Sequence, residues 1–363
     1  MPRVLFIAAH RPDRSPSQRY RFEQFVPYWE QHGFSFEQAW LLEEKDDARF
    51  YAAGNLFAKG VIFLKGIRRR MAHIKWAQEF DLIIVQREAF MTGSTYFERA
   101  LYKTGVPVVF DFDDAIWLMD VSDGNRRLSW LKDPGKTDRI LGHVHHVIAG
   151  NEFLAEYARK HNKSVEVIPT VINTEKYRSA VSTGNSRPIV IGWTGSRTTI
   201  GHLKASVGML KDVQEKYGKA IQIRVISDRP LEEPGLEVLN VPWRSATEVE
   251  DLAGLDIGIM PLPDNDWSRG KCGFKGLQYM AMGKAVVLQD IGANKVIVQH
   301  GVNGYLASSR EEWVDRLEDL INDNDLRTRM GTAARRTIEE KWSVIAWRDR
   351  YLELFNKLIA ENK

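Results

Sequence analysis

The sequence predicts an α/β protein of two domains, each built on a parallel sheet. Short apolar runs typical of buried strands, such as RVLFIAA at 3–9 and DLIIVQ at 81–86, alternate with segments of helical periodicity. The small polar segment 180–187 interrupts this alternation, which starts again with PIVIGW at 188–193. A chain of 363 residues has the length of two domains.

The clearest unit of the pattern lies at residues 256–288. A buried strand leads through the polar loop DNDWSRGK at 264–271 into a helix that ends at Gly283, and a second buried strand follows. Strand, loop, helix and strand in this order build a parallel sheet. The loop follows the carboxyl end of a strand, where α/β sheets bind ligands, and its cations predict a phosphate-bearing ligand. These cations are Arg269, Lys271 and Lys275.

Composition excludes several classes of protein. The formal net charge of +3 is too small to imply nucleic-acid binding, and no apolar run approaches the ~20 residues of a spanning helix. The single cysteine, Cys272, rules out a disulfide framework within the chain. Because the first residues, MPRVLFIAAH, become polar too soon for a signal peptide, we expect a cytoplasmic location.

The segment QYMAMGKAVV at 278–287 resembles the signature of the retaining glycosyltransferases of family 4. Members read Glu, seven residues, Glu, and then Ala-Met-Ala-x-Gly-x-Pro-Val-Val. This chain matches the second half but has Gly270 and Gln278 at the two glutamate positions. Gln278 can still hydrogen-bond a ribose hydroxyl, whereas Gly270 offers only its backbone. A subset of the family is similar here, with Lys-x-x-x-Lys, as in Lys271 and Lys275.

The resemblance implies a GT-B fold, in which two Rossmann-like parallel-sheet domains face each other across a cleft. It places an acceptor-side domain at 1–180, a nucleotide-sugar domain at 186–340 and a helix at 341–363 that crosses back to the first domain. The implied activity is retaining, metal-independent transfer of a sugar from a nucleotide-diphosphate sugar, without a cofactor. Family habit suggests a glycan or lipid-linked acceptor, in polysaccharide or lipopolysaccharide synthesis.

Two loops of the second half are expected to bind the donor diphosphate. Family members carry Gly-Arg and then Lys-Gly after the first strand of this domain, and this chain has Gly195, Ser196 and Arg197 there, without the lysine. The missing charge reappears in the later loop as Arg269, Lys271 and Lys275. Positive charge at these loops would stabilise the leaving diphosphate, which makes Lys271 a catalytic candidate.

The strand that begins at residue 106 ends in a group of acidic residues that allows two interpretations. Asp111, Asp113 and Asp114 resemble the Asp-x-Asp metal site of GT-A transferases, in which carboxylates hold a divalent cation. By their order in the chain, Asp113 and Asp114 instead match the polar turn that faces donor sugar and acceptor in family 4, which we favour. One of the three acids could also cap the next helix.

Three further residues are candidates for the acceptor side. Arg19 and Arg21 lie in a long basic loop after the first strand, where an arginine could reach the donor phosphates or an anionic acceptor, or could simply be solvated. Asn151 follows a strand and opens a helix, so it suits an N-cap as well as a polar site.

Residues 57–77 form a basic amphipathic stretch. Phe57, Leu64, Ile67, Met71 and Ile74 share one helical face. One interpretation packs this face on the sheet, and the other makes the stretch a surface for anionic lipid headgroups at the inner face of a membrane.

Because both family glutamates are absent, a non-enzymatic sugar-nucleotide or glycan-binding protein of the same fold is the main alternative, followed by a metal-dependent transferase that uses Asp111 and Asp113.

Overall fold

The computed structural model describes residues 1–52, 54–118, 133–178 and 188–362, and the expected linker at 180–187 lies outside the described residues. The chain divides into two compact units. The first comprises Met1–Thr170 and Trp347–Lys363, and the second comprises Val171–Ala346.

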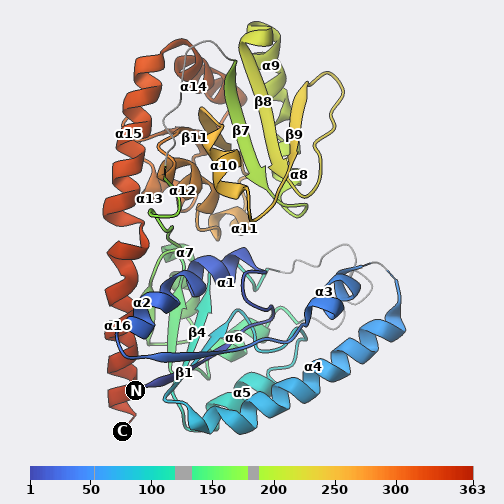
Figure 1. Ribbon diagram of the computed structural model, residues 1–363, viewed down its shortest axis with the longest axis vertical. Helices are drawn as coiled ribbons and strands as arrows, with labels where there is room; N and C mark the ends of the chain where they lie inside the picture. The colour runs from blue at the N-terminus through green and yellow to red at the C-terminus, as the bar shows by residue number, and fades with distance from the viewer. Residues whose placement is uncertain (53, 119–132, 179–187, 363) are drawn as a thin grey trace. The chain divides into compact units, whose positions relative to one another are not determined.

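The first unit contains a six-stranded parallel sheet in the order β2-β1-β3-β4-β5-β6 (Figure 1). Its central strands are apolar and fully buried, as expected for a sheet covered on both faces. The strands are β1 (Arg3–Ile7), β2 (Ser35–Ala39), β3 (Leu82–Gln86), β4 (Val108–Phe112), β5 (His146–Ala149) and β6 (Val165–Val167). The helices are α1 (Pro16–Arg21), α2 (Val26–Gln31), α3 (Glu44–Tyr51), α4 (Leu56–Trp76), α5 (Tyr96–Tyr102), α6 (Lys136–Leu141) and α7 (Glu152–Arg159).

The second unit contains another six-stranded parallel sheet, in the order β12-β11-β10-β7-β8-β9. Its strands are β7 (Ile189–Gly195), β8 (Ile221–Ser227), β9 (Val238–Pro242), β10 (Ile257–Met260), β11 (Ala285–Gln289) and β12 (Tyr305–Ala307). Its helices are α8 (Ile200–Lys204), α9 (Val207–Tyr217), α10 (Glu248–Ala253), α11 (Asp266–Arg269), α12 (Phe274–Ala281), α13 (Asn294–Ile297), α14 (Arg310–Asn322) and α15 (Asn324–Lys341).

The strand order of the second sheet is that of a doubly wound dinucleotide-binding fold. Counted from β7, the order is 6-5-4-1-2-3, so the direction of winding reverses between β7 and β10. In the first sheet the reversal falls between β1 and β3. Ligands of such sheets bind outside the carboxyl ends of the strands at the reversal. The topology therefore selects the loops after β7 and β10, and those after β1 and β3.

The carboxyl-terminal helix α16 (Val344–Glu361) packs against α2 of the first unit through aromatic side chains. The rings of Tyr351 and Phe355 each lie 5.2 Å from Trp29 of α2, measured between ring centroids. Tyr351 also donates a hydrogen bond to the backbone carbonyl of Arg21. These contacts explain why residues from 347 onward belong to the first unit although they follow the second in the chain.

Helix α4 differs from the packing that its sequence predicted. Phe57 and Leu64, expected on the packed face, are exposed, and the buried seam instead contains Lys59, Gly66 and Arg70. The Arg70 guanidinium donates to the carbonyls of Ala8 and Ala39 after β1 and β2, and Gly66 lets the ring of Phe90 approach closely. The two carbonyl oxygens offset part of the cost of burying this arginine, whose Nε makes no hydrogen bond within the described residues. A pattern of apolar residues cannot reveal those partners. Among the described residues, no helix is long and apolar enough to cross a bilayer.

Candidate functional site

The loop after β7 is held in a fixed shape by its own hydrogen bonds. The Ser196 amide donates to Thr199 Oγ1 at 3.0 Å, and the Arg197 amide donates to Asp228 Oδ1 at 2.6 Å. A Cβ at Gly195 would lie 2.2 Å from the Trp193 ring and 2.7 Å from Thr199 Oγ1, so only glycine fits there. The three donor-loop residues predicted from the sequence thus lie together at the carboxyl end of β7.

The loop after β10 brings two lysines to the start of α12. The Lys271 amine lies 5.1 Å from the Trp267 ring centroid, and the Lys275 amine lies 5.5 Å from the ring centroid of Trp193 on β7. An ammonium over an indole face is stabilised by the ring quadrupole. Lys275 therefore joins the β10 loop to the β7 loop, which is the arrangement that the sequence predicted for a diphosphate site.

His202 of α8 belongs to the same cluster, and sequence reasoning missed it. Burial, together with the nearby charges of Lys271 and Lys275, lowers the pKa of His202 to about 4. Its Nδ1 atom is buried and makes no hydrogen bond within the described residues. The signal for His202 that the sequence offered was its position one turn after the predicted phosphate loop. The site thus presents a neutral imidazole beside two ammonium groups.

Arg269 forms ion pairs with acidic residues of its own loop. Its guanidinium forms ion pairs with Asp264 at 2.7 Å and Asp266 at 2.9 Å, both close to it in the chain. Because two carboxylates already offset its charge, Arg269 contributes less to a field for anions than the sequence suggested.

Gln278 is a buried member of a hydrogen-bond network centred on Glu248. Its amide nitrogen donates to Glu248 Oε1 at 3.0 Å. The same carboxylate accepts hydrogen bonds from the Tyr177 hydroxyl at 2.8 Å and the Trp243 indole at 3.3 Å. The glutamate that the family carries at position 278 is absent, but a carboxylate from α10 lies directly beside that position. Sequence reasoning missed Glu248 because it is 30 residues from Gln278.

In the first unit, Arg21 and Asp111 form a buried ion pair. The guanidinium reaches both carboxylate oxygens, with a shortest distance of 2.5 Å, and also donates to the Ile168 carbonyl. The exposed fractions of the two side chains are 1% and 6%. Each of the two side chains therefore neutralises the other inside the unit. The roles expected for Arg21 at donor phosphates or an anionic acceptor, and for Asp111 at the acceptor side, stay predictions.

Arg19 and Asn151 also serve the structure of the first unit. The Arg19 side chain is buried, pairs with Asp13 at 3.1 Å and lies over the Tyr20 ring. Asn151 accepts the Leu154 amide as the N-cap of α7. These contacts give both side chains a structural role, and the role expected on the acceptor side stays a prediction.

Asp113 lies directly after the carboxyl end of β4 and accepts hydrogen bonds from two neighbouring side chains. It accepts hydrogen bonds from the Ser17 hydroxyl at 2.7 Å and from two nitrogens of Arg87 at 2.8 and 2.9 Å. Burial pushes the pKa of Asp113 up, but the charges of Arg87 and Arg21 outweigh burial and hold the pKa below its usual value. Asp114 lies 3.8 Å from Arg87 and accepts the Ala115 amide. Asp113 is therefore an ionised group and a weak base.

Arg87 and His10 also follow strands of the first sheet, and neither was predicted as a site residue. Arg87 follows β3 directly with φ at +59°, a left-handed conformation that non-glycine residues adopt mainly at constrained sites. His10 lies after β1, with its Nε2 3.3 Å from the Tyr51 hydroxyl. Burial lowers the pKa of His10 to about 4. Their positions directly after buried strands were a signal that the sequence offered.

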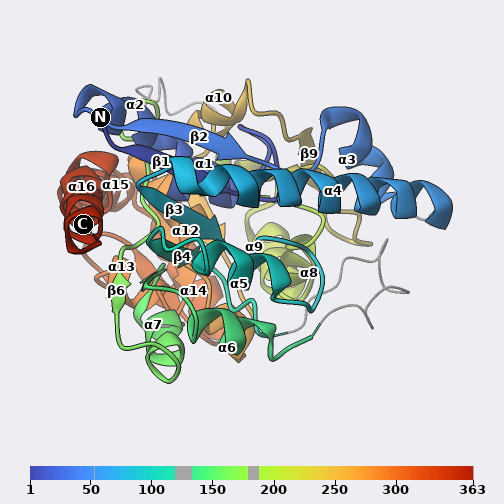
Figure 2. The ribbon, with the colours of Figure 1, turned by 90° about the horizontal axis from the view of Figure 1, so that it is seen from below.

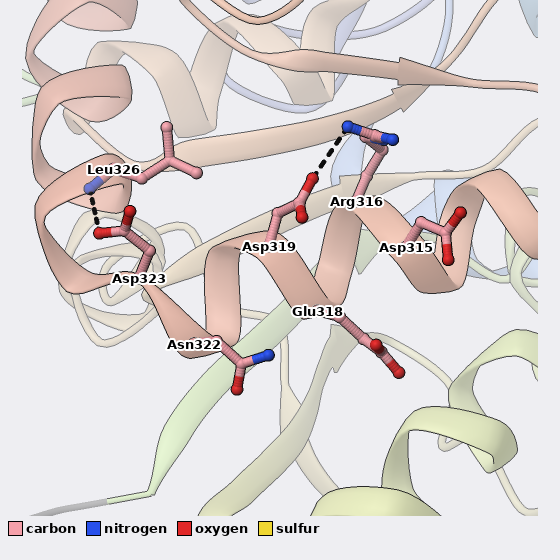
Figure 3. Close-up of a pocket in the computed structure, with 7 residues that line it drawn as sticks. All are labelled: Asp315, Arg316, Glu318, Asp319, Asn322, Asp323 and Leu326. Carbon is pink, nitrogen blue, oxygen red and sulfur yellow. Dashed lines mark hydrogen bonds and ion pairs between the residues drawn. The ribbon is translucent and has the colours of Figure 1, made fainter.

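A surface depression on α14 is a structural feature rather than a site (Figure 3). Three of the four acidic side chains that line it have partners: Asp319 pairs with Arg316, Asp323 caps the Leu326 amide, and Glu318 pairs with Lys216. No residue predicted for the site lines it.

Part of the second unit matches a known protein family. Residues 267–337, which include both lysines, match the family model described as Glycosyl transferases group 1. No curated protein matches the sequence significantly.

Solved structures share the fold over nearly the whole chain. Sucrose-phosphate synthase from Thermosynechococcus elongatus is 11% identical, with a TM-score of 0.68 and coverage of 99% of this chain and 100% of that one. Anabaena HepE in complex with UDP and glucose is 15% identical, with a TM-score of 0.66 and coverage of 97% and 99%. The lipopolysaccharide outer core galactosyltransferase WaaB is 12% identical, with a TM-score of 0.61 and coverage of 98% and 99%.

These findings confirm the predicted fold class and the predicted enzyme class. The chain has the fold of these proteins, and its match to the Glycosyl transferases group 1 model lies within the second unit.

Proposed function

We propose that this protein transfers a sugar from a nucleotide-diphosphate sugar, with a uridine nucleotide as the first donor to test, to a glycan or lipid-linked acceptor. The observation that carries the proposal is the pair of ammonium groups, Lys271 and Lys275, beside the glycine-containing β7 loop at the winding reversal of the second sheet. The complexes of HepE with UDP and glucose support the choice of donor, and WaaB supports a lipopolysaccharide-type acceptor.

In this proposal the second unit stabilises the leaving group. As the bond between the sugar C1 and the diphosphate oxygen breaks, negative charge grows on the diphosphate. Lys271 and Lys275 offset that charge in a preorganised site, together with the amides of the β7 loop. Side chains then supply the positive charge that a divalent cation supplies in other transferases.

Metal independence is also favoured by the contacts of the acidic residues in the first unit. Arg21 covers Asp111, and Arg87 together with Ser17 occupies one oxygen of Asp113. A divalent cation at these carboxylates would have to displace two arginines. We propose instead that Asp113 accepts a hydrogen bond from an acceptor hydroxyl.

We propose that transfer retains the anomeric configuration by attack on the same face that the diphosphate leaves. Gly270 provides no carboxylate, so a covalent glycosyl-enzyme at that position is impossible. The acceptor oxygen forms the new bond to C1, and its proton passes to the departing diphosphate. This route suits a site whose ionised Asp113 is a weak base.

A panel of UDP-, GDP- and dTDP-sugars, each with and without EDTA, tests the proposal. We expect slow hydrolysis of one donor, unchanged by the chelator, and a product whose first-formed anomer has the configuration of the donor by proton NMR. Activity abolished by EDTA would overturn metal independence and would favour a metal-dependent transferase that uses Asp111 and Asp113. Absence of binding to every donor would instead favour a binding protein of this fold.

A further inference from the structure

Helix α4 carries a row of large apolar side chains that the protein leaves in solvent. Leu56, Phe57 and Leu64 are 61%, 84% and 61% exposed, and Val61 lies between them on the same outward face. A helix of a water-soluble unit normally turns such residues toward its core. Here the inward face is occupied by Lys59, Ile62, Gly66 and Arg70.

The outward face becomes basic farther along the same helix. Arg68 and Lys75 are exposed, and Lys65 keeps about half of its side chain exposed beside Asp46. No Asp or Glu occurs in α4. The outward face therefore combines apolar side chains in its first turns with cations in its later turns.

The neighbouring helix α5 continues this character. Figures 1 and 2 show α5 beside α4 in two perpendicular views, and the two helices are in contact. Its exposed residues are Tyr96, Arg99 and Tyr102, and the exposed Lys103 follows directly after it. Its one acid, Glu98, is buried, where it accepts the Ala89 amide and pairs with Lys136. Two adjacent helices thus expose apolar groups, tyrosines and cations but no acid.

We propose that the outward faces of α4 and α5 form a docking surface for an anionic lipid bilayer. Phe57 and Leu64 would enter the boundary between headgroups and acyl chains, the tyrosines would lie at headgroup depth, and the cations would contact lipid phosphates. This surface deepens the proposed function, because it would bring the enzyme to a lipid-linked acceptor. A second copy of the chain is a poor occupant, since a two-fold contact would bring this acid-free basic surface against itself.

The test is co-sedimentation of the full chain with vesicles of phosphatidylcholine, with and without phosphatidylglycerol. We expect binding only to the anionic vesicles, weakening as salt rises. Phe57→Asp with Leu64→Asp should reduce binding at least ~10-fold, because each change removes apolar burial and adds repulsion. Arg68→Glu with Arg99→Glu should reduce it by a similar factor and flatten the salt dependence.

Matched controls come from exposed positions of the second unit. Val296→Asp replaces a side chain that is 74% exposed, and Lys219→Glu reverses an exposed charge. Both should bind vesicles like the wild type, and all variants should keep wild-type circular dichroism and donor hydrolysis.

Equal binding to neutral and anionic vesicles, no binding, or an equal loss in the controls would overturn the proposal. So would self-association that Phe57→Asp abolishes in a chain that ignores vesicles. Vesicle binding without binding of any donor would leave this surface standing and would overturn the proposed function alone.

Discussion

The carboxyl ends of the two sheets present different charged groups. In the first unit, Arg21 meets Asp111 and Arg87 meets Asp113, so cations and carboxylates are matched within the protein. In the second unit, Lys271 and Lys275 lie over indole rings and depress the pKa of His202. A matched network suits an uncharged hydroxyl acceptor, whereas a positive field suits a diphosphate. This difference supports the proposal that the second unit binds the diphosphate.

The largest expected effect is on the stability of the first unit. Arg21→Met leaves Asp111 buried without its cation, which should reduce the free energy of unfolding by about 3–5 kcal/mol, measured by urea denaturation. Arg21→Met combined with Asp111→Leu should recover much of this loss. The exposed pair Arg350–Glu166 provides the control, and Arg350→Ala should change stability by less than about 1 kcal/mol. A negligible effect of Arg21→Met would mean that the pair is not the internal contact described.

The next largest effect should be on donor binding by the second unit. Lys271→Ala and Lys275→Ala should each weaken binding of the nucleotide-sugar by about 10–150-fold, the value of a charge-assisted contact of ~1.5–3 kcal/mol. Arg269→Ala, whose charge two carboxylates already offset, should change binding much less. Equal losses for all three variants would remove the distinction between the lysines and Arg269. Calorimetric titration of each variant checks this.

A smaller effect should follow from filling the β7 loop. Gly195→Ala places a Cβ 2.2 Å from the Trp193 ring, over which Lys275 lies. We expect a loss of about 1–3 kcal/mol in stability together with weaker donor binding. Gly201→Ala is the matched control, since a Cβ there has open space around it in α8. If both variants behaved alike, the close packing of this loop would not matter.

The smallest expected effect is a pH dependence carried by His202. Its pKa is about 4 in the folded protein and 6.5 ordinarily. Between these values the unfolded chain binds a proton that the folded chain does not, so stability present above pH 6.5 is lost as the pH falls toward 4. Because His202 is only partly buried, we expect its share to be about 1 kcal/mol. His202→Asn should reduce the acid slope of urea midpoints, whereas His143→Asn, at an exposed position, should leave the slope unchanged.

The strands and the phosphate loop were predictable because they are local. Buried strands are apolar runs, and the loop at 264–271 follows one directly. The partners of the charged residues were not predictable. Arg21 and Asp111 are 90 residues apart in the sequence, and nothing in either segment identifies the other as its partner. The exposure of Phe57 was not predictable for the same reason. The face of α4 that packs inward carries Arg70, whose carbonyl partners lie at the ends of two different strands.

Titration of UDP and UDP-sugars into the wild type and the Lys271→Ala, Lys275→Ala double variant, both in EDTA, tests the central claim most directly. The account predicts that the wild type binds without metal and that the folded double variant loses at least ~100-fold in affinity. Wild-type binding that requires a divalent cation, or a double variant that binds as tightly as the wild type, would contradict it.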